Sequence, residues 1–417
     1  MSTIKSNLNQ QAPVKSAPLP DSESPALCLA HPTPDECVEI WTNTSAAWKD
    51  SLTVPVHITE SKYLTTVPLA KDGGMTIWAL VDGTLPPDQR QILSSCESFR
   101  KRSLASDAQG NVTEGLIHGI ASVYCAPKVR RRGYAARHMS ELAKRLRSWQ
   151  EEHGKSLGSV LYSDIGREYY AKLGWAPNAT NWHLDFPPVT AAAWPEGAGQ
   201  ILEGNLEELC AKDEALVREA MAQPEPSVEK RVTILPDLDH MLWHLKKEEF
   251  ASKYIFGKVP QAKGAIAGSP GKKVWAIWTH RYYDHPFNVE TPDNVLYILR
   301  LVVEGDTTAN KVHPVNHTNG ENGSSGERGT AWDEEQAAAV KAVLQAAQAE
   351  AADWRLEHVK LWEPSPYVEK IIEGSELDYE KVERPDESVA SGMWFDDDGE
   401  ILTEAPAWIN NEHYAWC

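Results

Sequence analysis

The stretch Gly115–Cys125, GLIHGIASVYC, constrains the fold more than any other part of the sequence. It is almost continuously apolar, which is typical of a strand that is covered on both faces. A loop with four basic residues and a glycine follows, and the apolar stripe from Ala135 to Trp149 then predicts an amphipathic helix. A buried strand, a basic loop and a helix therefore come in direct succession.

The surrounding pattern predicts a mixed α/β fold. A helix is expected at 33–48, strands at 75–82, 92–102, 158–164 and 181–186, and a short helix that Gly174 closes. Proline, alanine and glycine gather near 187–200 and indicate a domain boundary there. We predict a disordered N-terminal tail over 1–26, a first domain over 27–190, which the strand at 181–186 completes, and a second α/β domain over 200–417.

The second half repeats the element order of the first half. Two strands, KKVWAIWTHRYY and NVLYILRLVVE, precede a long helix that starts at Asp333, and the strand HVKLWE and a helix at YVEKIIEG follow. This order predicts that the second domain is a degenerate relative of the first, without the basic loop. The Asn-, Gly- and Ser-rich residues 305–330 predict a flexible insert.

The composition excludes several classes of function. Sixty Asp and Glu residues against 41 Lys and Arg give a formal net charge of −19, so neither nucleic acid nor an anionic membrane is expected as the main partner. The six cysteines are scattered without a CxxC pair, and we expect no metal site. No apolar run resembles a signal peptide or a membrane span, which favours a cytoplasmic location.

The basic loop has the composition of a phosphate-binding site. Arg130, Gly133 and Ala135 fit the pattern Arg or Gln, two residues, Gly, one residue, Gly or Ala. Backbone N–H groups of such a loop, together with the positive end of the following helix, can hold a diphosphate. The glycine lets the backbone approach the anion closely. A solvated cluster of positive charges is the alternative.

Two motifs resemble the GNAT superfamily of acetyl-CoA-dependent N-acetyltransferases: VYCAPKVRRRGYAARHMSEL and LYSDIGREYYAKLGW. Together with segments of the second half, they are most similar to fungal L-lysine N6-acetyltransferases of lysine degradation. The resemblance implies a GNAT-like first domain in which Tyr170 protonates the departing thiolate. The acetyl-CoA-binding residues that it implies are Val123, Tyr124, Cys125, Arg130, Arg131, Arg132, Gly133, Tyr134, Ala135 and Ser163.

The chemistry of acetyl transfer suggests the remaining roles. Direct transfer in a ternary complex is expected, with a backbone N–H near Val123–Cys125 facing the carbonyl oxygen. An acyl intermediate on Cys125 is the rival route. Glu97 and His118 are both candidates for the general base, and sequence does not decide whether Tyr169 or Tyr170 faces the sulfur.

The acceptor site is less constrained. Arg100 and Arg102, or Arg281 of the second domain, are candidates for holding the α-carboxylate of an amino acid. The expected substrate is L-lysine. A different amine (a protein lysine, a polyamine or another metabolite) and a non-catalytic CoA-binding protein remain alternatives, and the oligomeric state is not predicted.

Overall fold

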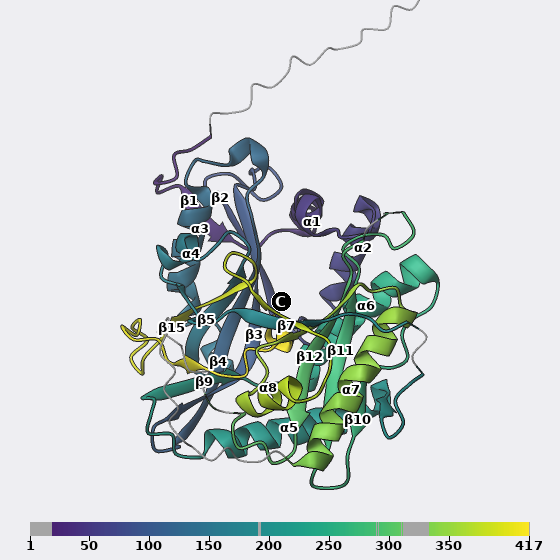
Figure 1. The fold of residues 1–417 in the computed structure, drawn as a ribbon. Helices are drawn as coiled ribbons and strands as arrows, with labels where there is room; N and C mark the ends of the chain where they lie inside the picture. The colour runs from purple at the N-terminus through teal and green to yellow at the C-terminus, as the bar shows by residue number, and fades with distance from the viewer. Residues whose placement is uncertain are drawn as a thin grey trace, which may run out of the picture.

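A computed structural model describes residues 19–190, 193–288, 290, 292–309, 311 and 333–416. In this part of the chain two β-sheets lie side by side (Figure 1). Helices α3 and α4 lie beside the first sheet, and α7 packs along the second. None of the helices in the described ranges is both long enough and apolar enough to cross a membrane.

The first sheet contains nine strands in the described residues, with the main order β1-β2-β3-β4-β5-β15-β6 and with β9 and β16 attached through β3. Their bounds are β1 (Leu27–Ala30), β2 (Met75–Asp82), β3 (Ser94–Asp107), β4 (Val112–Tyr124), β5 (Ser156–Ser163), β6 (Ala176–Pro177), β9 (Lys230–Ile234), β15 (Val389–Trp394) and β16 (Ala407–Trp408).

The second sheet has the order β14-β7-β13-β12-β11-β10-β8. Its strands are β7 (Trp182–Phe186), β8 (Gly199–Ile201), β10 (Gly264–Ala267), β11 (Val274–Arg281), β12 (Val295–Val303), β13 (His358–Trp362) and β14 (Glu380–Glu383). The central strand β12 is buried along its whole length, as its continuous apolar sequence requires.

Eight α-helices connect the strands of the described chain: α1 (Pro34–Trp48), α2 (Val54–Leu64), α3 (Tyr134–Leu146), α4 (Glu168–Ala171), α5 (Leu206–Met221), α6 (Leu238–Phe256), α7 (Glu334–Asp353) and α8 (Pro366–Glu373). Short 3₁₀ turns occur at η1 (Pro127–Val129), η2 (Glu151–His153), η3 (Glu203–Asn205) and η4 (His413–Ala415). The start of α1 shows how sequence sets these bounds, since Thr33 and Glu36 form a capping box around Pro34.

The two halves share one pairing scheme. In the first, β3 and β4 are antiparallel, and α3 carries the chain from β4 to the parallel strand β5. In the second, β11 and β12 are antiparallel, and α7 precedes the strand β13, which is parallel to β12. The predicted mixed α/β fold with a second, related domain is therefore confirmed.

The chain crosses between the sheets more often than its linear order suggests. Strand β7 pairs with β13 and β14 in the second sheet, so the prediction that residues 181–186 complete the first unit was wrong. Conversely, β15 comes from the C-terminal quarter and pairs with β5 of the first sheet. Each of these strands finds its partner far along the chain, which local patterning does not encode.

The described end of the predicted tail is not an isolated coil. Residues 19–26 contain a turn, with the Ser24 N–H donating to the Asp21 carbonyl at 3.0 Å. Leu19 packs against a cluster that contains Tyr134. The predicted tail therefore differs from the structure in these eight residues. Residues 1–18 and most of the predicted insert at 305–330 lie outside the described residues.

A buried ion network joins α5, β12 and the C-terminal segment. Arg300 on β12 is 5% exposed; its Nε and Nη2 donate to Asp213 at 2.8 and 2.9 Å, and its Nη1 donates to Glu412. Arg300→Ala leaves two buried carboxylates without their counter-ion, so we expect the free energy of unfolding to fall by about 3–5 kcal/mol in urea denaturation.

Arg102→Ala is the matched control. Arg102 also pairs with a carboxylate, Glu214, but its side chain is half exposed to solvent. Its removal should lower the free energy of unfolding by less than about 1 kcal/mol. Equal losses for the two variants would contradict the assigned network.

Candidate active site

The first sheet opens between two of its central strands. The parallel ladder of β4 and β5 runs from Leu116–Ser156 to Ile120–Leu161. Beyond this point β4 continues to Tyr124 and β5 to Ser163 without pairing to each other. The β4 edge that faces this gap can pair with an extended ligand, as sheet edges do with extended peptides.

A bulge turns the end of β4. Ser122 has a φ of 55°, and the register with β3 shifts between Ser95 and Glu97. The residues Ala121–Val123 are half-buried, unlike the fully buried positions just before them. Bulges of this kind redirect backbone groups and are frequent beside active sites.

The basic loop leads from this open edge to the N-terminus of α3. Residues Arg130–Gly133 are all exposed, and Arg131 and Gly133 both have positive φ, at 61° and 84°. Gly133 is the N-cap of α3 and offers no capping side chain. Three arginines therefore lie directly before the positive N-terminal end of the helix, where its first backbone N–H groups are unpaired. This arrangement favours the binding of a phosphate group.

Parts of the loop have structural partners. Arg130 Nε donates to the Cys125 carbonyl at 2.8 Å, and its guanidinium lies over the Tyr124 ring, 5.3 Å from the centroid. The Tyr134 hydroxyl donates to the Pro20 carbonyl, so this buried ring holds the N-terminal segment. Ser22 of that segment stands close to Gly133, because a Cβ there would lie 2.7 Å from the Ser22 Oγ.

The other residues predicted to bind acetyl-CoA lie around the same gap. Val123 is half-buried at the end of β4, and Ala135 is half-buried in the first turn of α3. Ser163 ends β5, and its Oγ donates to the Gly166 carbonyl at 2.8 Å. The loop and the two strand ends thus bring the predicted residues to one region.

Tyr170 is held on the short helix α4. Its ring is 8% exposed and packs in a cluster with Met139, Leu161 and Trp175. Burial raises the pKa of its phenol, so the group stays protonated at neutral pH, as a general acid must. Tyr169 packs edge-on against it, with ring centroids 5.0 Å apart.

Glu97 and Ser122 meet at the bulge. Glu97 lies opposite Ala121 in the β3–β4 ladder, and its carboxylate accepts a hydrogen bond from Ser122 Oγ at 3.0 Å. Burial raises the pKa of this carboxyl, while Ser122, Lys247 and His57 pull it down. A half-buried carboxyl with a raised pKa has the properties of a general base.

His118 lies elsewhere. It is fully buried, its Nε2 is 3.3 Å from Gln150 Oε1, and burial lowers its pKa to about 4. It precedes Ile120 by two residues and so shares the β4 face that packs against α3. Glu97 pairs with Ala121, on the opposite face. The two predicted bases are therefore not brought together.

The thiol of Cys125 is unlike an activated nucleophile. Its Sγ donates to the Leu93 carbonyl at 3.2 Å, and burial raises its pKa. Nucleophilic cysteines need the opposite shift. This environment therefore does not favour the alternative route through an acyl-cysteine intermediate.

The three arginines proposed for an acceptor carboxylate are spread over the molecule. Arg100 is half-buried opposite His118, and Arg102 pairs with Glu214. Arg281 on β11 binds Asp50 at 2.9 Å and lies over the rings of Tyr283 and Trp416. Of the three, Arg281 lines a small cavity.

That cavity is small, about 20 Å³, and lies between α2, α6, β11 and the C-terminal segment. Lys247 Nζ donates to Glu60 at 2.9 Å inside it. Burial opposes the ionisation of Glu60, but Lys247 and His57 outweigh it and lower its pKa to about 2. Sequence reasoning missed Glu60 and Lys247, since no motif links residues so far apart. Among the described residues there is no cluster that could hold a metal ion.

Comparisons with known proteins agree with this architecture. Residues 183–417 match the family model described as the LYC1 GNAT-like C-terminal domain. No curated protein is similar enough to count as a match.

Solved structures of low identity were also found. A probable N-acyltransferase from Enterococcus faecalis is 10% identical, covers 88% of this chain and 72% of its own, and has a TM-score of 0.47. A GCN5-related N-acetyltransferase from Kribbella flavida is 14% identical over 89% and 72% of the two chains, also with a TM-score of 0.47.

The match to the family model extends over more than half of the chain, so the protein is a GNAT-type acetyltransferase. Within that class it belongs to the LYC1 GNAT-like family. GNAT folds generally bind acetyl-CoA, and the open edge of β4 with the Arg130–Gly133 loop fits such a ligand.

The loop allows a test of how the anion is held. Gly133→Glu places a negative side chain at a left-handed position where backbone N–H groups meet the ligand, so CoA binding in calorimetry should be abolished. Arg131→Ala removes one exposed charge and should weaken binding by roughly 3- to 10-fold. If both variants lost CoA affinity equally while their circular dichroism stayed unchanged, the loop would act only as a cluster of positive charges.

Proposed function

We propose that the protein transfers the acetyl group of acetyl-CoA to the N6 amine of L-lysine by direct attack in a ternary complex. One observation carries this proposal: the gap between β4 and β5 ends at an exposed basic loop on the N-terminus of α3. The family match makes acetyl transfer to an amine the expected reaction. The choice of lysine rests on the resemblance of the sequence to fungal lysine N6-acetyltransferases, as do a role in lysine degradation and a cytoplasmic location.

In this proposal the loop residues Arg130–Gly133 and the start of α3 hold the diphosphate, and the β4 edge at Val123–Cys125 binds the pantetheine arm. Acetyl-CoA supplies an activated thioester carbonyl. A backbone N–H of Val123–Cys125 donates a hydrogen bond to the carbonyl oxygen as this oxygen gains negative charge. Positioning of the amine against this carbonyl supplies much of the rate.

Proton transfer is assigned to two residues on different elements. Tyr170 gives a proton to the departing thiolate, since burial keeps its phenol protonated. Glu97 receives a proton from the amine, directly or through water, because lysine has an ordinary pKa near ~10.4 and must lose a proton before attack. His118 is not assigned the base, since it lies on the buried face of β4 that packs on α3.

The acceptor is placed beside Glu97, toward the cavity at Glu60, Lys247 and Arg281. Leu64 of α2 and Trp243 of α6 pack in one cluster with Ala121, the β4 residue that pairs with Glu97. Lys247 and His57 on these two helices both lower the pKa of Glu97. Arg281 carries a guanidinium for an α-carboxylate, in exchange for part of its contact with Asp50. The small cavity must widen for lysine. Its wall at the C-terminal segment consists of His413 in the short turn η4 and of Trp416, just after that turn.

An amine panel tests the proposal. The purified protein is incubated with acetyl-CoA and lysine, a lysine peptide, a polyamine or another metabolite amine, and thiol release is followed. Release that depends on free lysine supports the proposal. If thiol were released only with another amine, that amine would be the acceptor instead of lysine. CoA binding without turnover would indicate a non-catalytic protein.

Tyr170→Phe tests the general acid. It removes the hydroxyl and keeps the packing of the ring, so kcat should fall by about 10²- to 10⁴-fold with little change in the dissociation constant of acetyl-CoA. Tyr169→Phe is the matched control on the neighbouring residue and should lose much less. A larger loss in the control would move the role to Tyr169.

Glu97→Gln tests the base through its pH dependence. The raised pKa means that Glu97 becomes protonated, and inactive as a base, as the pH falls through that value. The wild-type kcat/KM should therefore fall on the acid side, and the variant should be slow and lack this limb. An unchanged acid limb in Glu97→Gln would assign the titration to another group.

A further inference from the structure

The second sheet repeats the strand divergence of the first. The parallel ladder of β12 and β13 ends at Ile298–Leu361, while β12 continues to Val303. A cavity of about 1040 Å³ opens there, with Arg300–Val303 on one side and Glu363, just after β13, on another. Its volume is that of a site for a small organic molecule. It shares no lining residue with the cavity at Arg281.

The electrostatics of this cleft are opposite to those of the loop on α3. Helix α7, the counterpart of α3, begins with the N-cap Asp333, followed by Glu334 and Glu335. These three residues do not line the cavity, and Asp333 and Glu335 pair with Lys272. Eight acidic residues line the cavity against three basic ones, and one of the three, Arg300, is already paired with Asp213 and Glu412. The cleft therefore disfavours a diphosphate and favours a cation.

Glu363 is one of the residues that line this cleft. It is 8% exposed, and its backbone is left-handed, with a φ of 34°. Burial raises the pKa of its carboxyl to about 7, against the charge of Arg384, the polar side chains of Thr180 and Asn411, and a hydrogen bond from the Trp182 N–H at 3.3 Å. Both the burial and the backbone strain cost stability, and a carboxyl kept in such a place is a candidate for binding a ligand.

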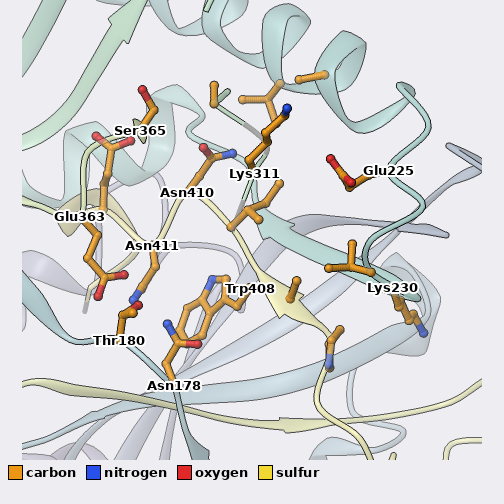
Figure 2. A pocket seen from close by; sticks show the side chains of 18 of the residues that line it. Asn178, Thr180, Glu225, Lys230, Lys311, Glu363, Ser365, Trp408, Asn410 and Asn411 are labelled. Carbon is orange, nitrogen blue, oxygen red and sulfur yellow. The ribbon is translucent and has the colours of Figure 1, made fainter. Parts of the chain in front are cut away.

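Donor groups without partners line the same cleft. Figure 2 shows Asn411, Thr180 and Asn178 gathered beside Trp408 on the cavity wall. Asn411 accepts from the Tyr162 hydroxyl through Oδ1 at 3.0 Å. By geometry, neither its Nδ2 nor the Nε1 of Trp408 has a hydrogen-bond partner among the described residues. The Asn411 side chain nevertheless lies close enough to Glu363 to lower the pKa of that carboxyl. Asn411 and Trp408 are 3% and 7% exposed. Buried donors of this kind call for an acceptor on a ligand.

We propose that the cleft between β12 and β13 binds a small organic ammonium compound that also carries a hydrogen-bond acceptor. Glu363 is the counter-ion of the ammonium group, and Asn411 and Trp408 donate to the acceptor. The second domain has thus kept the strand geometry of a CoA site and changed its ligand from an anion to a cation. This site is independent of the acetyl transfer proposed for the first domain.

Isothermal titration of the full chain without acetyl-CoA tests the site. The probe is N-acetyl-1,4-diaminobutane, which has one ammonium and one amide carbonyl. Its matched analogues are N-butylacetamide, without the charge, and butylamine, without the carbonyl. Each analogue should bind at least about 10-fold more weakly than the probe, since each loses one charge-assisted or buried hydrogen bond.

Variants locate the probe. Glu363→Gln should weaken binding at least about 10-fold, and Glu363→Asp should restore part of it. Glu373→Gln, at an exposed position of α8, is the control and should bind like the wild type. Loss of binding in Glu60→Gln with normal binding in Glu363→Gln would place the probe in the other cavity and overturn the proposal.

Hydrogen exchange of the wild-type protein gives a readout that does not depend on how the variants fold. The probe should protect residues 176–180 and 407–411, which line the cleft. Protection confined to other segments, equal binding of N-butylacetamide, or no saturable binding up to about 10 mM would each overturn the proposal. So would two CoA molecules bound per chain, since the cleft would then have kept its original ligand class.

Discussion

The parallel pairing of β4 and β5 stops at Ile120 and Leu161, although both strands continue. Neighbouring strands of a parallel sheet ordinarily form hydrogen bonds with each other along their length. This interruption therefore leaves an unpaired strand edge on β4 in the middle of the molecule. The bulge at Ser122 lies just beyond this point, where Glu97 accepts a hydrogen bond from Ser122 Oγ, and the loop Arg130–Gly133 comes after the end of the same strand. The basic loop and the candidate base Glu97 therefore lie at the end of β4 where this divergence occurs.

The C-terminal segment makes the two sheets one structure. Glu412 binds Arg300 of the second sheet, while Lys101 of the first donates to the Ala415 carbonyl at 2.8 Å and the Tyr414 hydroxyl donates to Ile234 on β9. Figure 1 shows the chain end lying between the sheets. Trp408 and Asn411 of the same segment line the cleft of the second domain, and His413 and Trp416 line the cavity at Arg281. The two cavities therefore share a wall formed by neighbouring residues of one segment.

Sequence predicted what short-range physics determines. The apolar run of β4, the amphipathic stripe of α3 and the glycine at its N-cap each lie within a few residues, and the structure has all three. The prediction of the sheet that contains β7 was wrong because its partner strands, β13 and β14, are about 175 and 200 residues away in the sequence. Glu60 and Lys247 could not be predicted, since a charge pair between α2 and α6 has no local pattern. The clustering of Glu363, Asn411 and Trp408 could not be predicted for the same reason, since these residues are far apart in the sequence.

A crystal structure of the protein with bound CoA tests the central claim most directly. We expect the pantetheine arm between the ends of β4 and β5, paired with the backbone at Val123–Cys125, and the diphosphate at Arg130–Gly133. In that complex the sulfur should lie closer to the hydroxyl of Tyr170 than to that of Tyr169. A coenzyme bound instead between β12 and β13, or one that leaves the β4–β5 gap empty, would contradict it.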